Sequence, residues 1–136
     1  MQATHAAGEP TIFKPPSSLS FPASEVELLF DHPSNFIFLA VNDAEPAGYL
    51  FGELIERGES SITYAHRVVY VHHLAVDSRF RRQGLGSKLL GAAEEIAREH
   101  GISAIALDTW SFNRNAGQFF EQAGFSPYNV KLRKEI

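Results

Sequence analysis

The chain has 136 residues, of which 44% are hydrophobic and 21% charged, as in a soluble globular domain of ordinary size. The net charge of −4 argues against general nucleic-acid binding, which requires a basic surface. The absence of cysteine excludes disulfides, thiolate zinc sites and cysteine nucleophiles. No apolar run approaches the ~18 residues of a membrane span, and the N-terminus lacks a signal-peptide pattern. We therefore expect one cytoplasmic domain over residues 1–136, with no nucleic-acid or membrane partner.

The first third of the chain predicts a short arm followed by a hairpin. Residues 1–21 are rich in proline and serine, which predicts a loose or short N-terminal arm, or one short strand around residues 11–13. Ser24 is a candidate N-cap for a helix over residues 25–30. Residues 35–41 and 47–56 are separated by turn-forming residues and read as paired strands.

The rest of the chain alternates strands and helices. Apolar residues recur at helical spacing before Gly101, and again between Asn113 and Gly124, so both stretches are expected to be helical. The expected elements are a strand over 67–76, a helix over 85–100, a buried strand over 102–109, a helix from Asn113 to Gly124 and a closing strand over 130–133. This order indicates an α/β (α+β) domain with helices packed on a mixed sheet.

A basic, glycine-containing loop joins the 67–76 strand to the following helix. It reads Arg81-Arg82-Gln83-Gly84-Leu85-Gly86-Ser87. Glycines let the backbone approach a ligand closely, and the start of a helix offers free N–H groups and the positive end of the helix dipole. The loop is therefore expected to bind a phosphate or a pyrophosphate.

Three kinds of phosphate-binding loop compete for this segment. A Walker loop requires Gly-Lys-Ser/Thr, whereas the order here is Gly86-Ser87-Lys88, so that interpretation fails. A dinucleotide fingerprint requires a third glycine where Leu89 stands; it is weakened but not excluded, because Asp108 lies at a suitable distance to hold a ribose. The third pattern, Arg/Gln-x-x-Gly-x-Gly/Ala after a strand, is matched from Arg81 to Gly86. It resembles the acyl-coenzyme A loop of the GCN5-related N-acetyltransferase (GNAT) family.

The resemblance extends beyond the loop, over roughly residues 36–133. Residues 74–77, Leu-Ala-Val-Asp, look like the family's coenzyme-binding strand and its exit. Asn113 and the run from Phe120 to Phe125 resemble its second motif, an asparagine followed by a helix that ends in Gly-Phe. Membership would imply a mostly antiparallel mixed sheet, flanked by helices and splayed at the coenzyme-binding strands.

The resemblance also implies a role for each part of the site. The main chain of residues 74–76 would pair with the pantetheine arm, and the amides of residues 82–87 would hold the pyrophosphate. Asn113 would contact the coenzyme from the opposite side, and Phe120 its sulfur. The implied coenzyme-binding residues are Leu74, Ala75, Val76, Arg81, Arg82, Gln83, Gly84, Leu85, Gly86, Ser87, Asn113 and Phe120.

Direct attack by an amine requires a base and an acid. Asp108 occupies the place of the catalytic glutamate in ribosomal-protein N-acetyltransferases, so it is expected to act as the base through a water; alternatively, it only orients the loop at 110–113. Many family members have a tyrosine acid where this chain has Phe120. Tyr128 is the candidate substitute, with a half-buried aromatic role as the alternative.

Other polar residues have more than one interpretation. His72 and His73 are expected on opposite faces of one strand, where they would not share a metal ion. Both are expected to have structural roles; alternatively, one of them contacts the acceptor or acts as the base. Glu53 and Glu56 either form a solvated face or bind a cation. No metal is expected.

These observations predict an acetyl-CoA-dependent N-acetyltransferase in which a primary amine attacks directly. The acceptor is expected to be a small polyamine or aminoglycoside-like molecule, or a protein amine. Homodimers are common in the family, so a homodimer is a further expectation by analogy. The alternative is a non-catalytic acyl-CoA-binding or sensing module, which the phenylalanine at position 120 favours.

Overall fold

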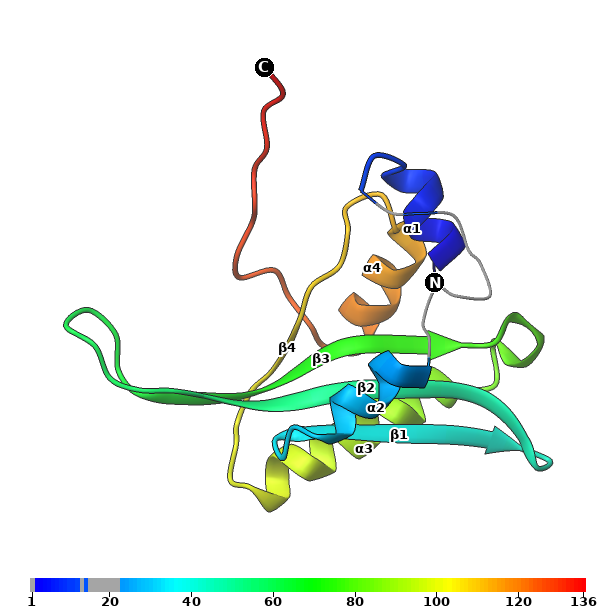
Figure 1. Ribbon diagram of the computed structural model, residues 1–136, viewed down its shortest axis with the longest axis horizontal. Coiled ribbons are helices and arrows are strands. Elements are labelled where there is room, and N and C mark those ends of the chain that lie inside the picture. The colour runs from blue at the N-terminus through cyan, green and yellow to red at the C-terminus, as the bar shows by residue number, and fades with distance from the viewer. Residues whose placement is uncertain (1, 13, 15–22) are drawn as a thin grey trace.

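The computed structural model describes residues 2–12, 14 and 23–136. Its elements, shown in Figure 1, are α1 (Gln2–Gly8), α2 (Ala23–Phe30), β1 (Asn35–Asn42), β2 (Glu45–Arg57), β3 (His66–Val76), the 3₁₀ turn η1 (Ser78–Phe80), α3 (Leu85–Glu99), β4 (Ile105–Leu107) and α4 (Arg114–Gln122). Within the described residues, no helix is long and apolar enough to cross a bilayer.

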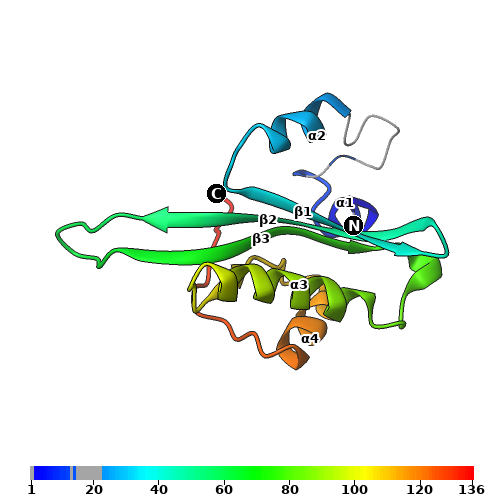
Figure 2. The same ribbon diagram turned by 90° about the horizontal axis from the view of Figure 1, so that it is seen from below.

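The four strands form one mixed sheet in the order β1-β2-β3-β4. The pairs β1–β2 and β2–β3 are antiparallel, whereas β4 runs parallel to β3 across the α3 crossover. Figure 2 shows α3 and α4 on one face of the sheet and α2 over the other. The predicted mostly antiparallel sheet flanked by helices is confirmed.

The core lies between α3 and the sheet. Leu89, Leu90 and Ala93 fall on one stripe of α3 because they are spaced at helical intervals, and they pack against Leu50 of β2 and Val71 of β3. Burial of a leucine side chain contributes roughly 1.5–3 kcal/mol. This packing holds the N-terminal end of α3 beside the exit of β3, where the basic loop lies.

The sheet is splayed between β3 and β4. These two strands pair only from Val69↔Ile105 to Val71↔Leu107, so β4 is shorter than the predicted strand over 102–109. Beyond Val71, β3 continues to Val76 and pairs with β2 on one side only. The predicted splay is confirmed, and it leaves a backbone edge of β3 open next to the loop.

The two ends of the chain differ from expectation. Thr11 and Ile12 lie in a turn after α1 and not in a strand, and residue 13 is outside the described residues. The predicted closing strand over 130–133 is wrong, because these residues lie in no strand and are exposed. Alternation of apolar residues favours an extended backbone there, but a strand forms only where a neighbour supplies hydrogen bonds.

Candidate active site

The basic loop presents its backbone in an unusual conformation. Gly84 has a φ of 77° and Arg82 a φ of 65°, so the loop enters the left-handed region twice within three residues. Such turns point successive N–H groups to a common side and form an anion-binding hollow. Gly84 is also the N-cap of α3 and makes no side-chain cap hydrogen bond. The amides of the first helical turn are therefore left for an anion.

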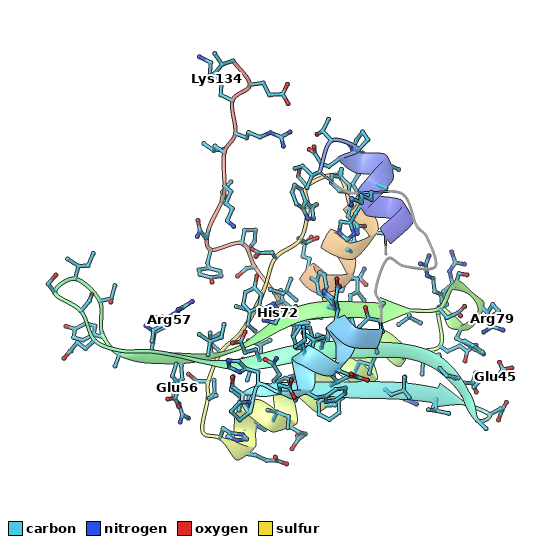
Figure 3. All side chains as sticks on the ribbon, viewed as in Figure 1. Glu45, Glu56, Arg57, His72, Arg79 and Lys134 are labelled. Atoms are coloured by element: carbon cyan, nitrogen blue, oxygen red, sulfur yellow. The ribbon has the colours of Figure 1, made fainter. Side chains whose placement is uncertain are left out.

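The arginines near the loop divide into two groups. Arg79 pairs with Asp77 at 3.3 Å and with Glu45 at 3.8 Å, at the end of the sheet labelled in Figure 3. Hydrogen bonds from the backbone and side chain of Arg79 lower the pKa of Asp77. Arg81 and Arg82 are exposed, and no ion pair of theirs occurs among the described residues. Arg79 fixes the turn, whereas the other two guanidinium groups face solvent and can meet a phosphate.

Other predicted coenzyme-binding residues lie at the end of β3 and in the loop that follows it. Leu74 and Val76 pack toward the α3 core. Ala75 faces the other way and lines an open hollow of about 470 Å³ together with Tyr49 and Arg81. Gln83 accepts a hydrogen bond from Asn42 Nδ2 at 3.3 Å, which ties the loop to the end of β1. Ala75, Val76 and Arg81 thus line one hollow at this end of the sheet, and their binding of the coenzyme stays a prediction.

A second hollow, of about 610 Å³, lies elsewhere in the fold. It is lined by Glu56, Arg57 and Arg67 near the β2–β3 turn, and by residues 101–103 at the end of α3. Figure 3 shows Glu56 and Arg57 at the opposite end of β2 from Glu45. None of the residues predicted to bind coenzyme lines this hollow.

The second predicted motif forms the α4 unit on the far side of the splay. The side chain of Asn113 caps α4 by accepting from the Ala116 N–H at 3.2 Å. Gly124 ends the helix with a φ of 96°, and the Phe125 N–H donates to the Phe120 carbonyl at 2.9 Å. The rings of Phe120 and Phe125 are in contact, 5.7 Å apart, the hydrophobic contact that often accompanies such a helix end. Phe120 is a partly buried residue that packs against the core; its contact with the coenzyme stays a prediction.

Asp108 has a partner that the sequence analysis missed. It follows β4 directly, and its Oδ2 accepts a hydrogen bond from the hydroxyl of Tyr70 on β3. Tyr70 pairs with Ala106 in the parallel register, so its long side chain reaches the residue two positions further along. Burial and the bond to Asp108 raise the pKa of Tyr70 above its usual range. Its hydroxyl is thus a protonated donor at neutral pH.

Tyr128, the candidate acid, is 82% exposed. It lies close enough to Tyr70 to contribute electrostatically to the raised pKa of that residue. Its role as an acid stays a prediction. Its expected alternative role as a half-buried aromatic does not fit this exposure.

The two histidines of β3 lie on one face, so the prediction of opposite faces is wrong. The β2–β3 register passes from Phe51↔His73 to Gly52↔Val71, which leaves His72 as the extra residue of a bulge. Both imidazoles contact the ring of Phe51. His72 Nε2 lies 2.7 Å from Glu53 Oε2. The bulge thus gathers both histidines and a carboxylate on the face away from α3.

This face also holds part of the N-terminal arm. His5 of α1 packs edge-on against Phe112, which stacks on Trp110. His73 is near His5 and His72; burial first, and then these two histidines, lower the pKa of His73. The polar side chains of β3, the loop over 110–112 and α1 therefore surround the outer side of the splay.

The fold combines a splayed mixed sheet with a basic, glycine-containing loop at the start of a central helix. The model of the Acetyltransferase (GNAT) family matches residues 10–125. The chain belongs to this family. Membership favours the coenzyme A interpretation of the loop over the dinucleotide one.

Individual relatives are distant. The chain is 27% identical over 97 residues to an uncharacterised N-acetyltransferase of the pepI 3′ region of Lactobacillus delbrueckii subsp. lactis, which covers 71% of this chain and 55% of the relative. The crystal structure of a tetramutant of the BH1408 protein from Bacillus halodurans has a TM-score of 0.94 at 20% identity, covering 99% of this chain and 86% of that one. The aminoglycoside N-acetyltransferase AAC(6′)-Iy in complex with CoA has a TM-score of 0.68 at 19% identity, covering 83% of this chain and 85% of that one. The chain spans about half the length of the curated relative.

Proposed function

We propose that the protein transfers the acetyl group of acetyl-CoA to a primary amine, by direct attack of the amine within a ternary complex. The observation that carries this proposal is the open edge of β3 next to a loop whose backbone enters the left-handed region at Arg82 and Gly84. An open edge suits an extended pantetheine arm, and the loop suits a pyrophosphate. Family membership supports the same assignment.

The residues of this end of the sheet fit the coenzyme. A Cβ at Gly84 would meet no atom within 4 Å, so a ligand can approach the backbone of Gly84 closely. Arg81 and Arg82 supply charge for the phosphates. An N–H of Leu74 or Ala75 polarises the thioester carbonyl and stabilises the oxyanion; one such donor typically contributes ~2.7–4 kcal/mol to lowering the barrier.

Asp108 is the proposed base. An amine of pKa near 10 is mostly protonated at neutral pH, so a carboxylate must take its proton, here through a water. Tyr70 is the proposed positioning residue, because its hydroxyl holds Oδ2 of Asp108 and leaves Oδ1 for that water. Removal of such a bond to a charged group costs roughly 1.5–3 kcal/mol.

Fewer observations identify the acid that protonates the leaving thiolate than identify the base. Phenylalanine at position 120 has no proton to donate. Tyr128 is the proposed acid, because its exposed hydroxyl is free to approach a bound substrate. A coenzyme thiol also leaves without full protonation, so we expect loss of the Tyr128 hydroxyl to slow the reaction by less than loss of the Asp108 carboxylate.

The proposed acceptor is a small molecule with several amino groups, such as a polyamine or an aminoglycoside. Two carboxylates support it: Asp108 bonds to Tyr70, and Glu53 is the cross-strand partner of Tyr70 and bonds to His72. Glu53 can hold a second ammonium group while the first one reacts beside Asp108. The fold likeness to an aminoglycoside N-acetyltransferase agrees with this choice. A protein amine is the second candidate.

The test is release of free thiol from acetyl-CoA in the presence of aminoglycosides, polyamines and peptides. We expect release with at least one multiply charged small amine. Asp108→Asn should slow turnover by a factor of about 100 or more, since a general base typically contributes about 10²–10⁴-fold. Tyr70→Phe is expected to slow turnover roughly 10-fold with little change in KM, as expected for the loss of a single hydrogen bond to a charged group. Asp43→Asn, in the β1–β2 turn, is the matched control. Tight acetyl-CoA binding without release from any amine would favour the acyl-CoA-binding module instead.

A further inference from the structure

A tight turn joins β1 to β2 at the end of the sheet where the basic loop lies. Asn42 and Glu45 form the last pair of the two strands, and Asp43 and Ala44 between them have φ values of 49° and 66°. Two successive left-handed residues are typical of a type I′ turn, whose twist matches that of the strands it joins. The strands and the turn together therefore hold the backbone of Asn42 and Glu45 in one arrangement.

Both residues of this pair contact the segment that connects β3 to α3. Asn42 Nδ2 donates a hydrogen bond to Oε1 of Gln83 at 3.3 Å, between residues 41 apart in the sequence. A carboxylate oxygen of Glu45 lies 3.8 Å from a guanidinium nitrogen of Arg79, and Figure 3 shows these two side chains next to each other at the end of the sheet. The end of one hairpin thus contacts the segment at two points, one before and one after Arg82.

Arg82 is the residue of this segment whose conformation needs support. It has a φ of 65°, and the left-handed region is unfavourable for a residue with a Cβ. Such a conformation persists only where the surrounding structure holds it. The segment is also attached where β3 ends, because the Asp77 N–H donates to the Ala47 carbonyl of β2 at 2.8 Å. Together with this attachment, the contacts of Arg79 and Gln83 restrain the backbone on both sides of Arg82.

We propose that Asn42 and Glu45 are positioning residues for the basic loop: they hold its backbone in the anion-binding conformation before a ligand arrives. Neither residue needs to touch the coenzyme. A loop that is already ordered loses less conformational freedom when it binds a pyrophosphate, so its affinity is higher. The restraint of the loop is independent of the proposed reaction, whereas its effect on acetyl-CoA affinity rests on the proposed function.

Trypsin, which cleaves after arginine and lysine, tests the restraint without any ligand. In the double variant Asn42→Ala/Glu45→Ala the loop should open more often. Cleavage after Arg81 and Arg82 should then be about 3- to 10-fold faster, as expected for the loss of one hydrogen bond and one surface ion pair. Each single variant should show part of this effect. Cleavage after Arg57, at the other end of β2, should not change.

Glu56→Ala is the matched control. Glu56 also lies on β2 and pairs with an arginine, Arg67, at 3.9 Å, but Figure 3 shows it at the opposite end of the strand from Glu45. Its removal should leave cleavage within the basic loop unchanged. Equal cleavage of this loop in the wild type and the double variant would overturn the proposal, and so would a control variant whose loop is cleaved as fast as that of the double variant.

Binding and kinetics test whether the restraint serves the coenzyme. The double variant should bind acetyl-CoA about 3- to 10-fold more weakly. Its kcat at saturating acetyl-CoA and its KM for the amine should not change, because an effect confined to coenzyme binding leaves the chemical step alone. In an Arg82→Gly background the loss of affinity should be smaller, since glycine adopts the left-handed region without strain.

Two binding results would overturn the positioning role: equal losses of affinity in both backgrounds, or an unchanged affinity of the double variant. A wild type that binds no acetyl-CoA would contradict the proposed function instead. The trypsin comparison would then decide by itself whether Asn42 and Glu45 restrain the loop.

Discussion

Gly84 offers the sharpest test of the loop, because its backbone geometry serves both stability and binding. It has a φ of 77°, and a Cβ there would meet no atom within 4 Å. Alanine therefore causes no clash, and its cost is the left-handed conformation itself, roughly 1–2 kcal/mol. Alanine also stiffens the unfolded chain, which offsets roughly 0.4–1 kcal/mol. The net loss for Gly84→Ala is about 1 kcal/mol, or a melting temperature about 4 °C lower.

Gly91→Ala is the control, because Gly91 lies inside α3 without a positive φ, and a Cβ added to it would also meet no atom within 4 Å. We expect this variant to gain about 0.5–1 kcal/mol. Melting is recorded with and without acetyl-CoA. A tenfold weaker affinity of Gly84→Ala would remove about 1.4 kcal/mol of ligand stabilisation, whereas Gly91→Ala should keep all of it. If both variants shift alike in either condition, the loop does not act through this backbone conformation.

Three further predictions concern stability. Leu50 is fully buried against α3, so Leu50→Ala should lower the free energy of unfolding in urea by about 2–5 kcal/mol; Leu39→Ala, at a position 62% exposed, should change it by less than about 1 kcal/mol, and equal effects would contradict the described core. The pKa of His73 is lowered below its ordinary value of 6.5. As the pH falls, the imidazole is therefore protonated in the unfolded chain before it is protonated in the folded one, and stability decreases below about pH 6.5. His73→Phe should make the loss of stability between pH 8 and pH 5 smaller, and an unchanged loss would refute this. Asn113→Ala should cost about 1 kcal/mol through the lost cap of α4, and Asn113→Ser should recover most of it; equal losses in thermal melts would assign the effect to another contact.

Local patterns predicted much of the fold. The apolar spacing in α3 and the glycine after it placed this helix to within a residue at its end. The helix ending at Gly124 followed from Asn113 as a cap and from glycine in a left-handed C-terminal position. Such signals lie within one turn of the chain, so they do not depend on tertiary contacts.

Features set by strand pairing could not be predicted in the same way. The bulge at His72 arises from the register between β2 and β3, and a shift of one residue moves side chains to the other face. The bond between Tyr70 and Asp108 joins residues 38 apart in the sequence. The parallel β3–β4 crossover would have suggested this contact, had the register been known. Likewise, the alternation in residues 130–133 predicts a strand, but these residues form none because no strand among the described residues pairs with them.

The most direct test of the proposed function is acetyl-CoA-dependent thiol release by the wild type and by Asp108→Asn, measured beside acetyl-CoA binding by both. We predict that the wild type releases thiol with a multiply charged small amine, that Asp108→Asn binds acetyl-CoA equally well, and that its release is slower by a factor of about 100 or more. Equal release by the two proteins would contradict the role of Asp108. Binding without any release by the wild type would contradict the transferase itself.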